Sequence, residues 1–221
     1  TTTILTGSII ASRINKGIKE EHQQVMFNAM GLAAFGLGIN SVVQNMPNSA
    51  YPVLFIISLA VGSLVGELLD IDGRFKRLTD RFSGGNSLAQ GLSTGILLFC
   101  VGTLSILGPI QSALYGDNTY LFTNATLDFF SATVLASTYG IGMCAAAIVL
   151  FCWQGAIYLC AGFLGPFLSQ ELLTEISVIG GFLIASSGMS ILNVKQFKTM
   201  NMLPCLLVPP VWFLIKGVIG L

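Results

Sequence analysis

The chain has 221 residues, of which 53% are hydrophobic and only 9% are charged, and its mean hydropathy is +0.80. A soluble domain carries roughly 25% charged residues, so this composition provides too little polar surface for a water-soluble fold of this size. Ten basic and ten acidic residues balance to a net charge of zero, which removes the basic surface that a nucleic-acid-binding protein needs. We therefore expect a polytopic membrane protein whose main partner is the lipid bilayer, with no nucleic acid as a partner.

The apolar runs predict an all-α integral membrane protein with seven or eight transmembrane helices, because one crossing takes about 20 residues. The first helix is shortened, and we expect the natural chain to begin upstream of it. The long run 118–170 contains a single charged side chain, Asp128, and has room for two crossings. The predicted helices cover 1–13, 25–45, 52–70, 87–112, two within 124–168, 173–192 and 202–220, in one membrane domain over 1–221 with no soluble domain.

Basic residues occur in alternate loops of this topology. They lie in 13–22, 72–87 and 193–199, whereas the three intervening loops contain none. If 124–168 crosses twice, all three basic loops lie on one side, which the positive-inside rule identifies as the cytoplasm. The pattern thus predicts a bacterial cytoplasmic (inner) membrane protein with these loops cytoplasmic. Lys216 is left over near the far end of the last helix, where its side chain could snorkel outward.

Three of the predicted helices carry glycines seven residues apart, a spacing that puts each pair on one line of the helix. In lipid, small residues on one line allow close helix packing. Two of these helices, GLAAFGLGIN and GFLIASSGMS, are each followed by a loop and a helix-opening proline, and they cross in opposite senses. We therefore predict an inverted repeat of helices 1–3 and 6–8, an architecture typical of secondary transporters; chance similarity between glycine-rich helices is the alternative. The pairs are Gly31 and Gly38, Gly95 and Gly102, and Gly181 and Gly188.

Asp128 is the first candidate for a functional residue. On a helical wheel Asp128, Ser131 and Thr138 share a sector of about 80°, interrupted by Leu135. An acid and two hydroxyls on one face could line a polar path through the membrane. The alternative is structural: with Asn124 as N-cap, Asp128 would lie near the first turn, where the helix dipole favours an acid.

Further polar side chains and glycines could contribute to such a path. Gly140 and Gly142 offer a helix break that frees backbone carbonyls. Glu67 is either a buried acid or an interfacial one that reaches, with Asp70 and Asp72, toward the basic loop. The amides at helix ends and at mid-span could bind a solute or instead bond across helices. These additional candidates are Gln154, Asn40, Gln44, Glu67 and Asn193.

The sequence predicts neither an enzyme nor a metal or cofactor site. The five cysteines lie in apolar runs without a C-x-x-C pair, and the single histidine, His22, lies among charged residues. The chain contains no H-E-x-x-H motif, no P-loop, and no G-x-S-x-G with a membrane histidine as base.

The segments TGSIIAS, GLAAFGLGIN, VGSLVGELLDID and LDFFSATVLASTYGIG, with the following WQG, resemble a family of bacterial membrane proteins, domain of unknown function 554 (YdfK/YqgA-like). The resemblance spans nearly the whole chain, and the LD…AST.GIG…QG series is its most specific part. The chain departs from the family pattern in its shortened first helix and at Phe129, where the family has a glycine. The resemblance implies a multi-pass inner-membrane protein, with transport as a candidate activity and no catalytic residues to carry over.

Together these observations predict a small secondary transporter or channel-like permease for a cation or a small neutral or zwitterionic solute. With one intramembrane acid and almost no basic lining, a free anion is disfavoured as substrate. A chain of 23.4 kDa has few helices, and few helices alone can hardly enclose a path through the membrane. We therefore expect a homo-oligomer. The alternative is a non-transporting membrane scaffold or partner subunit of a larger complex.

Overall fold

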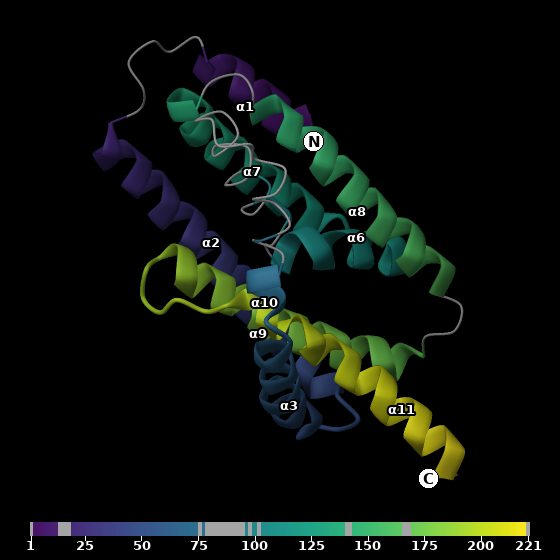
Figure 1. Cartoon of the computed structure of the whole chain (residues 1–221). Coiled ribbons are helices and arrows are strands. Elements are labelled where there is room, and N and C mark those ends of the chain that lie inside the picture. The colour runs from purple at the N-terminus through teal and green to yellow at the C-terminus, as the bar shows by residue number, and fades with distance from the viewer. Residues whose placement is uncertain are drawn as a thin grey trace. The chain divides into compact units, whose positions relative to one another are not determined.

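The computed structural model describes residues 2–12, 19–74, 77, 96, 99–100, 103–139, 143–164 and 169–219. Among these residues every regular element is a helix, which confirms the all-α prediction (Figure 1). The α-helices are α1 (Thr2–Ser12), α2 (Glu20–Asn45), α3 (Leu54–Leu69), α6 (Thr103–Tyr115), α7 (Thr119–Tyr139), α8 (Cys144–Leu164), α9 (Gln170–Ile191), α10 (Thr199–Met202) and α11 (Val208–Ile219). The described residues also include the short 3₁₀ helices η1 (Met46–Asn48) and η4 (Leu203–Leu207).

The long uncharged run folds into two helices, α7 and α8, as expected. Two of the differences from the predicted helices have a clear local cause. Helix α7 begins at Thr119 rather than at residue 124, because the Asp117 carboxylate accepts the Thr119 backbone N–H at 2.9 Å and starts the helix early. The last predicted helix is divided into α10, η4 and α11, because the proline at the start of η4, Pro204, lacks the N–H that a continuous α-helix needs.

Within the part of the chain that the structure describes, five helical segments are long and apolar enough to cross a membrane. They are Glu20–Asn48, Leu54–Arg74, Cys144–Phe163, Gln170–Ile191 and Thr199–Lys216. Helix α7 has 21 residues but carries a hydroxyl, amide or carboxyl side chain in every turn, which lowers its hydropathy below that of α8. A long helix of this polarity needs protein rather than lipid against its polar face.

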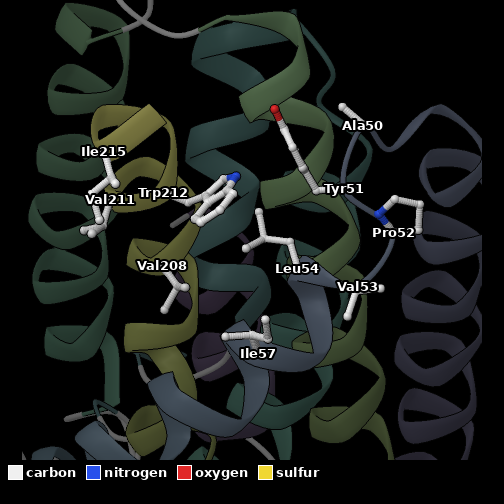
Figure 2. A pocket seen from close by; sticks show the side chains of 10 residues that line it. All are labelled: Ala50, Tyr51, Pro52, Val53, Leu54, Ile57, Val208, Val211, Trp212 and Ile215. Atoms are coloured by element: carbon white, nitrogen blue, oxygen red, sulfur yellow. The ribbon is translucent and has the colours of Figure 1, made fainter. Parts of the chain in front are cut away.

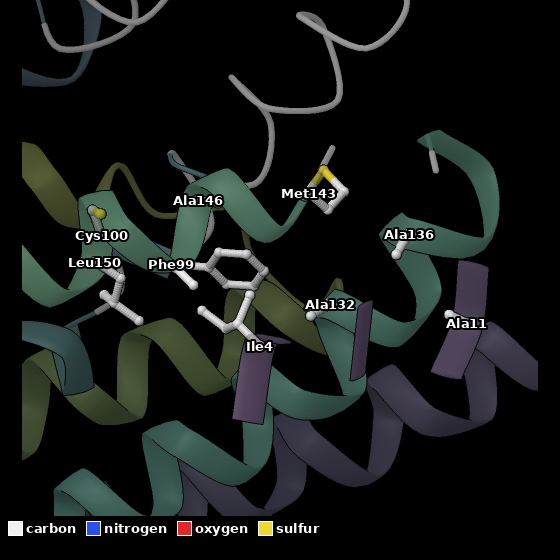
Figure 3. Close-up of a cluster of buried hydrophobic side chains, with 10 residues drawn as sticks. Ile4, Ala11, Phe99, Cys100, Ala132, Ala136, Met143, Ala146 and Leu150 are labelled. Atoms are coloured by element: carbon white, nitrogen blue, oxygen red, sulfur yellow. The ribbon is translucent and has the colours of Figure 1, made fainter. Parts of the chain in front are cut away.

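The chain forms two compact units. Unit 1 comprises Thr1–Met30 and Gly73–Pro166, and unit 2 comprises Gly31–Asp72 and Phe167–Leu221. In unit 1, both α1 and α6 contact α7 and α8. The core of this unit is a buried apolar cluster to which α1 contributes Ile4, α7 Ala132 and α8 Leu150, together with Phe99 (Figure 3).

Helix α9 is the core of unit 2. Its side chains are buried along most of its length, and it contacts α3, α10, η4 and α11. Helix α3 presents a buried stripe of one residue every four positions, Leu54, Ser58, Gly62 and Gly66. The two glycines of this stripe bring the α3 backbone against Cys205 and Asn201, so small residues again set the spacing between helices.

Helix α2 crosses α9 at the two glycine pairs that the sequence singled out. A methyl group added at Gly38 would lie 2.6 Å from the carbonyl oxygen of Gly181, and one added at Gly188 would lie 2.8 Å from that of Gly31. The first glycine of each helix therefore meets the second glycine of the other. A two-fold axis between α2 and α9 would produce this reciprocal pattern, as in an isologous interface. Gly95 and Gly102, the third predicted pair, lie outside the described residues.

The glycine crossing can be tested by comparing Gly38→Ala with Gly36→Ala. A Cβ at Gly38 meets backbone atoms of α9, whereas a Cβ at Gly36 meets nothing within 4 Å. We expect Gly38→Ala to lower the free energy of unfolding by about 1–3 kcal/mol through overpacking. The Gly36→Ala control should be neutral or stabilising by about 0.5–1 kcal/mol, because alanine is the better helix former. Thermal unfolding in detergent measures both, and equal effects would contradict the crossing.

Candidate functional site

Asp128 lies in the third turn of α7 and is 5% exposed. Its carboxylate accepts a hydrogen bond from the Asn124 side-chain amide, with 2.8 Å between Nδ2 and Oδ2. Because α7 begins at Thr119, Asn124 is inside the helix, and the interpretation of Asn124 as an N-cap with Asp128 near the first turn is wrong. The acid is held in the interior of unit 1 by an amide one turn away.

The other polar side chains of α7 include three threonines that bond to the helix itself and one buried serine. The hydroxyls of Thr123, Thr126 and Thr133 each bond to a carbonyl four residues earlier, so the helix itself satisfies them. Ser131 is buried beside Asp128, as the wheel predicted. The side chain of Thr138 and both residues of the predicted break, Gly140 and Gly142, lie outside the described part of the chain.

Helix α1 packs closely on this region of α7. A methyl group added at Gly7 would lie 2.7 Å from the carbonyl oxygen of Phe129, the residue after Asp128. On the same helix, the hydroxyl oxygens of Thr3 and Ser8 are buried and have no hydrogen-bond partner among the described residues. Buried polar atoms without a partner are rare in folded proteins and often mark a site that takes up water, an ion or a solute.

An apolar core adjoins the acid along α7. Ala132 follows Asp128 by four residues and therefore lies on the same face of the helix. It is fully buried in the cluster that contains Ile4 and Leu150. The carboxylate thus lies beside an apolar cluster, where an unpaired charge costs several kcal/mol unless a proton or a cation neutralises it.

Gln154 on α8 contacts Ser105 on α6 rather than Asp128. Its Nε2 lies 3.4 Å from the Ser105 Oγ, which is fully buried. This contact joins two helices across their interface, as expected for an amide in an apolar environment. The structure therefore brings Gln154 into a helix–helix contact within unit 1.

The path candidates of unit 2 lie at helix surfaces and helix ends. Asn40 and Gln44 are exposed on α2. Asn193 is also exposed; it has a φ of 57°, follows the end of α9, and accepts a hydrogen bond from Gln196 at 2.9 Å. A left-handed φ is a conformation that asparagine tolerates well, so Asn193 shapes the turn after α9.

Glu67 is an exposed acid near the end of α3. Its carboxylate accepts hydrogen bonds from the Lys198 ammonium and, at 2.7 Å, from the Asn201 side-chain amide. The hydrogen bond to Glu67 raises the pKa of Lys198. Asn201 is 2% exposed and also accepts the Asp72 backbone N–H at 2.7 Å. Together these bonds hold the end of α3 against the start of α10, so both lie at the same end of unit 2.

Glu175 was not among the candidate residues that the sequence predicted, although it falls within the predicted helix 173–192. Helix α9 begins at Gln170, so Glu175 lies in its second turn, where it is only 1% exposed. One carboxylate oxygen accepts the Ser49 hydroxyl at 2.7 Å and the Tyr51 backbone N–H at 3.0 Å. Glu175 therefore fixes the α2–α3 connection to the start of α9. The sequence signal was its position inside the apolar periodicity of the predicted helix 173–192.

The role of Glu175 can be tested with Glu175→Ala and the control Glu171→Ala. Truncation of Glu175 removes the buried acceptor of the Ser49 hydroxyl and the Tyr51 backbone N–H, which we expect to cost about 1–3 kcal/mol in the free energy of unfolding. Glu171 is exposed on the first turn of the same helix, and its loss should change stability by less than about 0.5 kcal/mol. Equal unfolding temperatures of the two variants would contradict this role of Glu175.

Two further observations bear on what the structure could bind. Within the described residues, no group of three or more His, Cys, Asp and Glu side chains could hold a metal ion. A cavity of about 500 Å³ lies in unit 2, lined by apolar side chains of α3 and α11, and none of the predicted path residues lines it. The acid site of unit 1 and the apolar cavity of unit 2 are therefore separate features.

Comparison with known proteins identifies the family of this chain. The family described as "Protein of unknown function (DUF554)" matches residues 1–214. The chain is 52% identical over 221 residues to the uncharacterized membrane protein YdfK of Bacillus subtilis (strain 168), which covers 100% of this chain and 96% of that protein. It is 26% identical over 216 residues to the uncharacterized protein YqgA of Escherichia coli (strain K12), covering 92% and 89% of the two chains. No solved structure matches significantly. The chain is an all-α integral membrane protein and belongs to the DUF554 family.

Proposed function

We propose that this protein is a secondary transporter or channel-like permease for a cation or a small neutral or zwitterionic solute, and that Asp128 is its binding carboxylate. One observation carries the proposal. Asp128 is buried in unit 1 with a neutral amide as its hydrogen-bond partner, and none of the described Lys and Arg side chains forms an ion pair with it. Intramembrane acids in such a position serve ion or solute pathways more often than structure.

The reciprocal glycine contact of α2 and α9 supports the same proposal. Gly31 meets Gly188 and Gly38 meets Gly181, as expected if the two hairpins α2–α3 and α9–α11 are inverted copies of one unit. Inverted repeats are a recurrent architecture of secondary transporters. The polar helix α7, packed against α1 and α6, adds a second line of support, because a helix of this composition suits a path better than a lipid-facing position.

The alternative is a non-transporting scaffold or partner subunit. The contact between Gln154 and Ser105 favours it, because this mid-span amide serves helix packing. In either case we propose that the protein acts without catalysis and as a homo-oligomer in the bacterial inner membrane.

A thermal-shift screen against monovalent cations and amino acids, with Asp128→Asn and the control Asp117→Asn, tests the proposal. Asp117 is an exposed acid just before α7. A ligand at 100 times its Kd should stabilise the wild type and the control by about 2.7 kcal/mol, and Asp128→Asn should lose that stabilisation. Uptake of the stabilising solute into proteoliposomes should fall with the same variant. Stabilisation that survives in Asp128→Asn removes Asp128 from the site, and no stabilisation by any solute favours the scaffold.

Cysteine labelling tests the proposed orientation. In a background without the five native cysteines, we expect Lys195→Cys to react with an impermeant maleimide only from the cytoplasmic side and Asn118→Cys only from the outside. What supports this expectation is the hydrogen bonding of Lys198 and Asn201 to Glu67, which holds the loop 193–199 beside the end of α3 that leads into the basic segment 72–87. Labelling of both positions from one side would exclude the double crossing of 124–168.

A further inference from the structure

The apolar cavity of unit 2 is an open groove between α3 and α11 (Figure 2). Aliphatic side chains form much of its lining, among them Leu54, Ile57 and Val208. Ile57 is 51% exposed, so the groove opens to the outside of the unit along helices that are apolar enough to cross a membrane. A groove with these properties contacts hydrocarbon rather than water.

One end of the groove has a different character. There Tyr51 and Trp212 meet edge to face, with ring centroids 5.9 Å apart. The Lys216 ammonium donates a hydrogen bond to the Tyr51 hydroxyl at 2.6 Å and lies 5.3 Å from the centre of its ring. Tyrosine, tryptophan and lysine are the residues that gather at the level of lipid headgroups. The groove is therefore amphipathic along its length, with a cationic aromatic end and an aliphatic end.

We propose that this groove binds an anionic phospholipid, with the headgroup phosphate at Lys216 and an acyl chain along Leu54, Ile57 and Val208. The ammonium has three N–H donors, and one is used by Tyr51, so two remain to be shared with phosphate oxygens. The aliphatic end matches a hydrocarbon chain, which contributes about 0.8 kcal/mol for each buried CH₂. The groove thus offers a positive charge for the headgroup of a phospholipid and an apolar surface for its acyl chain.

A second copy of the chain fits this groove less well. A two-fold axis along the membrane normal would bring Lys216 of both copies to the same level, where like charges repel. One nearby acid opposes the lipid: the Glu171 carboxylate acts electrostatically on Lys216, although the two residues form no ion pair among the described contacts. The preference for an anionic headgroup should therefore increase when Glu171 is neutralised.

Quenching of Trp212 fluorescence by brominated lipids tests the proposal directly. The chain has two tryptophans, so Trp153→Phe leaves Trp212 in the groove as the only reporter. This protein is reconstituted in phosphatidylcholine vesicles that contain increasing fractions of dibromo-phosphatidylglycerol or dibromo-phosphatidylcholine. We expect the phosphatidylglycerol to quench at an about five-fold lower mole fraction, the factor that one basic residue near the surface provides.

Matched variants make the outcome specific to the groove. Lys216→Gln should abolish the headgroup preference, Lys195→Gln should retain it, and Glu171→Gln should increase it. Ile57→Phe, which fills the groove, should reduce quenching by phosphatidylglycerol, whereas Ile56→Phe on the adjacent exposed position should not. Equal quenching by both lipids in the parent protein, a preference that persists in Lys216→Gln, or no quenching by either lipid, as expected if another copy covers the groove, would each overturn the proposal.

Discussion

Close backbone contact between α2 and α9 is the constraint on which unit 2 depends. Lipid gives helices no hydrophobic reason to associate, so dispersion contact between closely spaced backbones must provide the attraction. The glycines of the crossing allow this spacing, and the hydroxyl of Ser41 then reaches the carbonyl oxygen of Ser177 at 3.2 Å. Two residues earlier on α9, Glu175 accepts the backbone N–H of Tyr51 in the α2–α3 connection and so positions Tyr51, which in turn holds Lys216. The cationic end of the apolar groove is thus a consequence of the glycine crossing.

Three acidic side chains show how partners decide the role of a charge near the membrane. Glu67 is exposed and bonds to a lysine and an amide, so its charge is compensated at the surface and adds little stability. Glu175 is buried, but a hydroxyl and a backbone N–H donate to it, and a carboxylate that accepts such bonds fixes a connection. Asp128 is buried with a single neutral amide on its own helix. Of the three, it has the least compensation from the described residues.

Local patterns in the sequence were sufficient to predict the helices and the glycine-lined faces along which two of them pack. The presence of only one charged side chain over 118–170 correctly implied two helices, and the seven-residue glycine spacing identified the residues of the α2–α9 crossing. The start of α7 was misjudged, because its first turns contain Thr119, Thr123 and Asn124, which resemble a loop; the Asp117 carboxylate accepts the Thr119 backbone N–H just before the helix. The sequence could not show that Glu175 holds the α2–α3 connection. Its donors Ser49 and Tyr51 are more than 120 residues away in the chain, and only the tertiary fold brings them together.

The composition of α7 finally explains why a carboxylate can persist in unit 1. A helix with a polar group in every turn is unfavourable against lipid, but α1 approaches it at Gly7 and α6 also packs against it. Thr123, Thr126 and Thr133 bond to carbonyls of their own helix, so these hydroxyls place no demand on neighbouring helices. The buried polar groups Asn124, Asp128 and Ser131 therefore lie in a protein-lined environment next to the apolar cluster at Ala132. In such surroundings the binding or release of one cation changes the local free energy far more than it would in water, which is the property that a gated path requires.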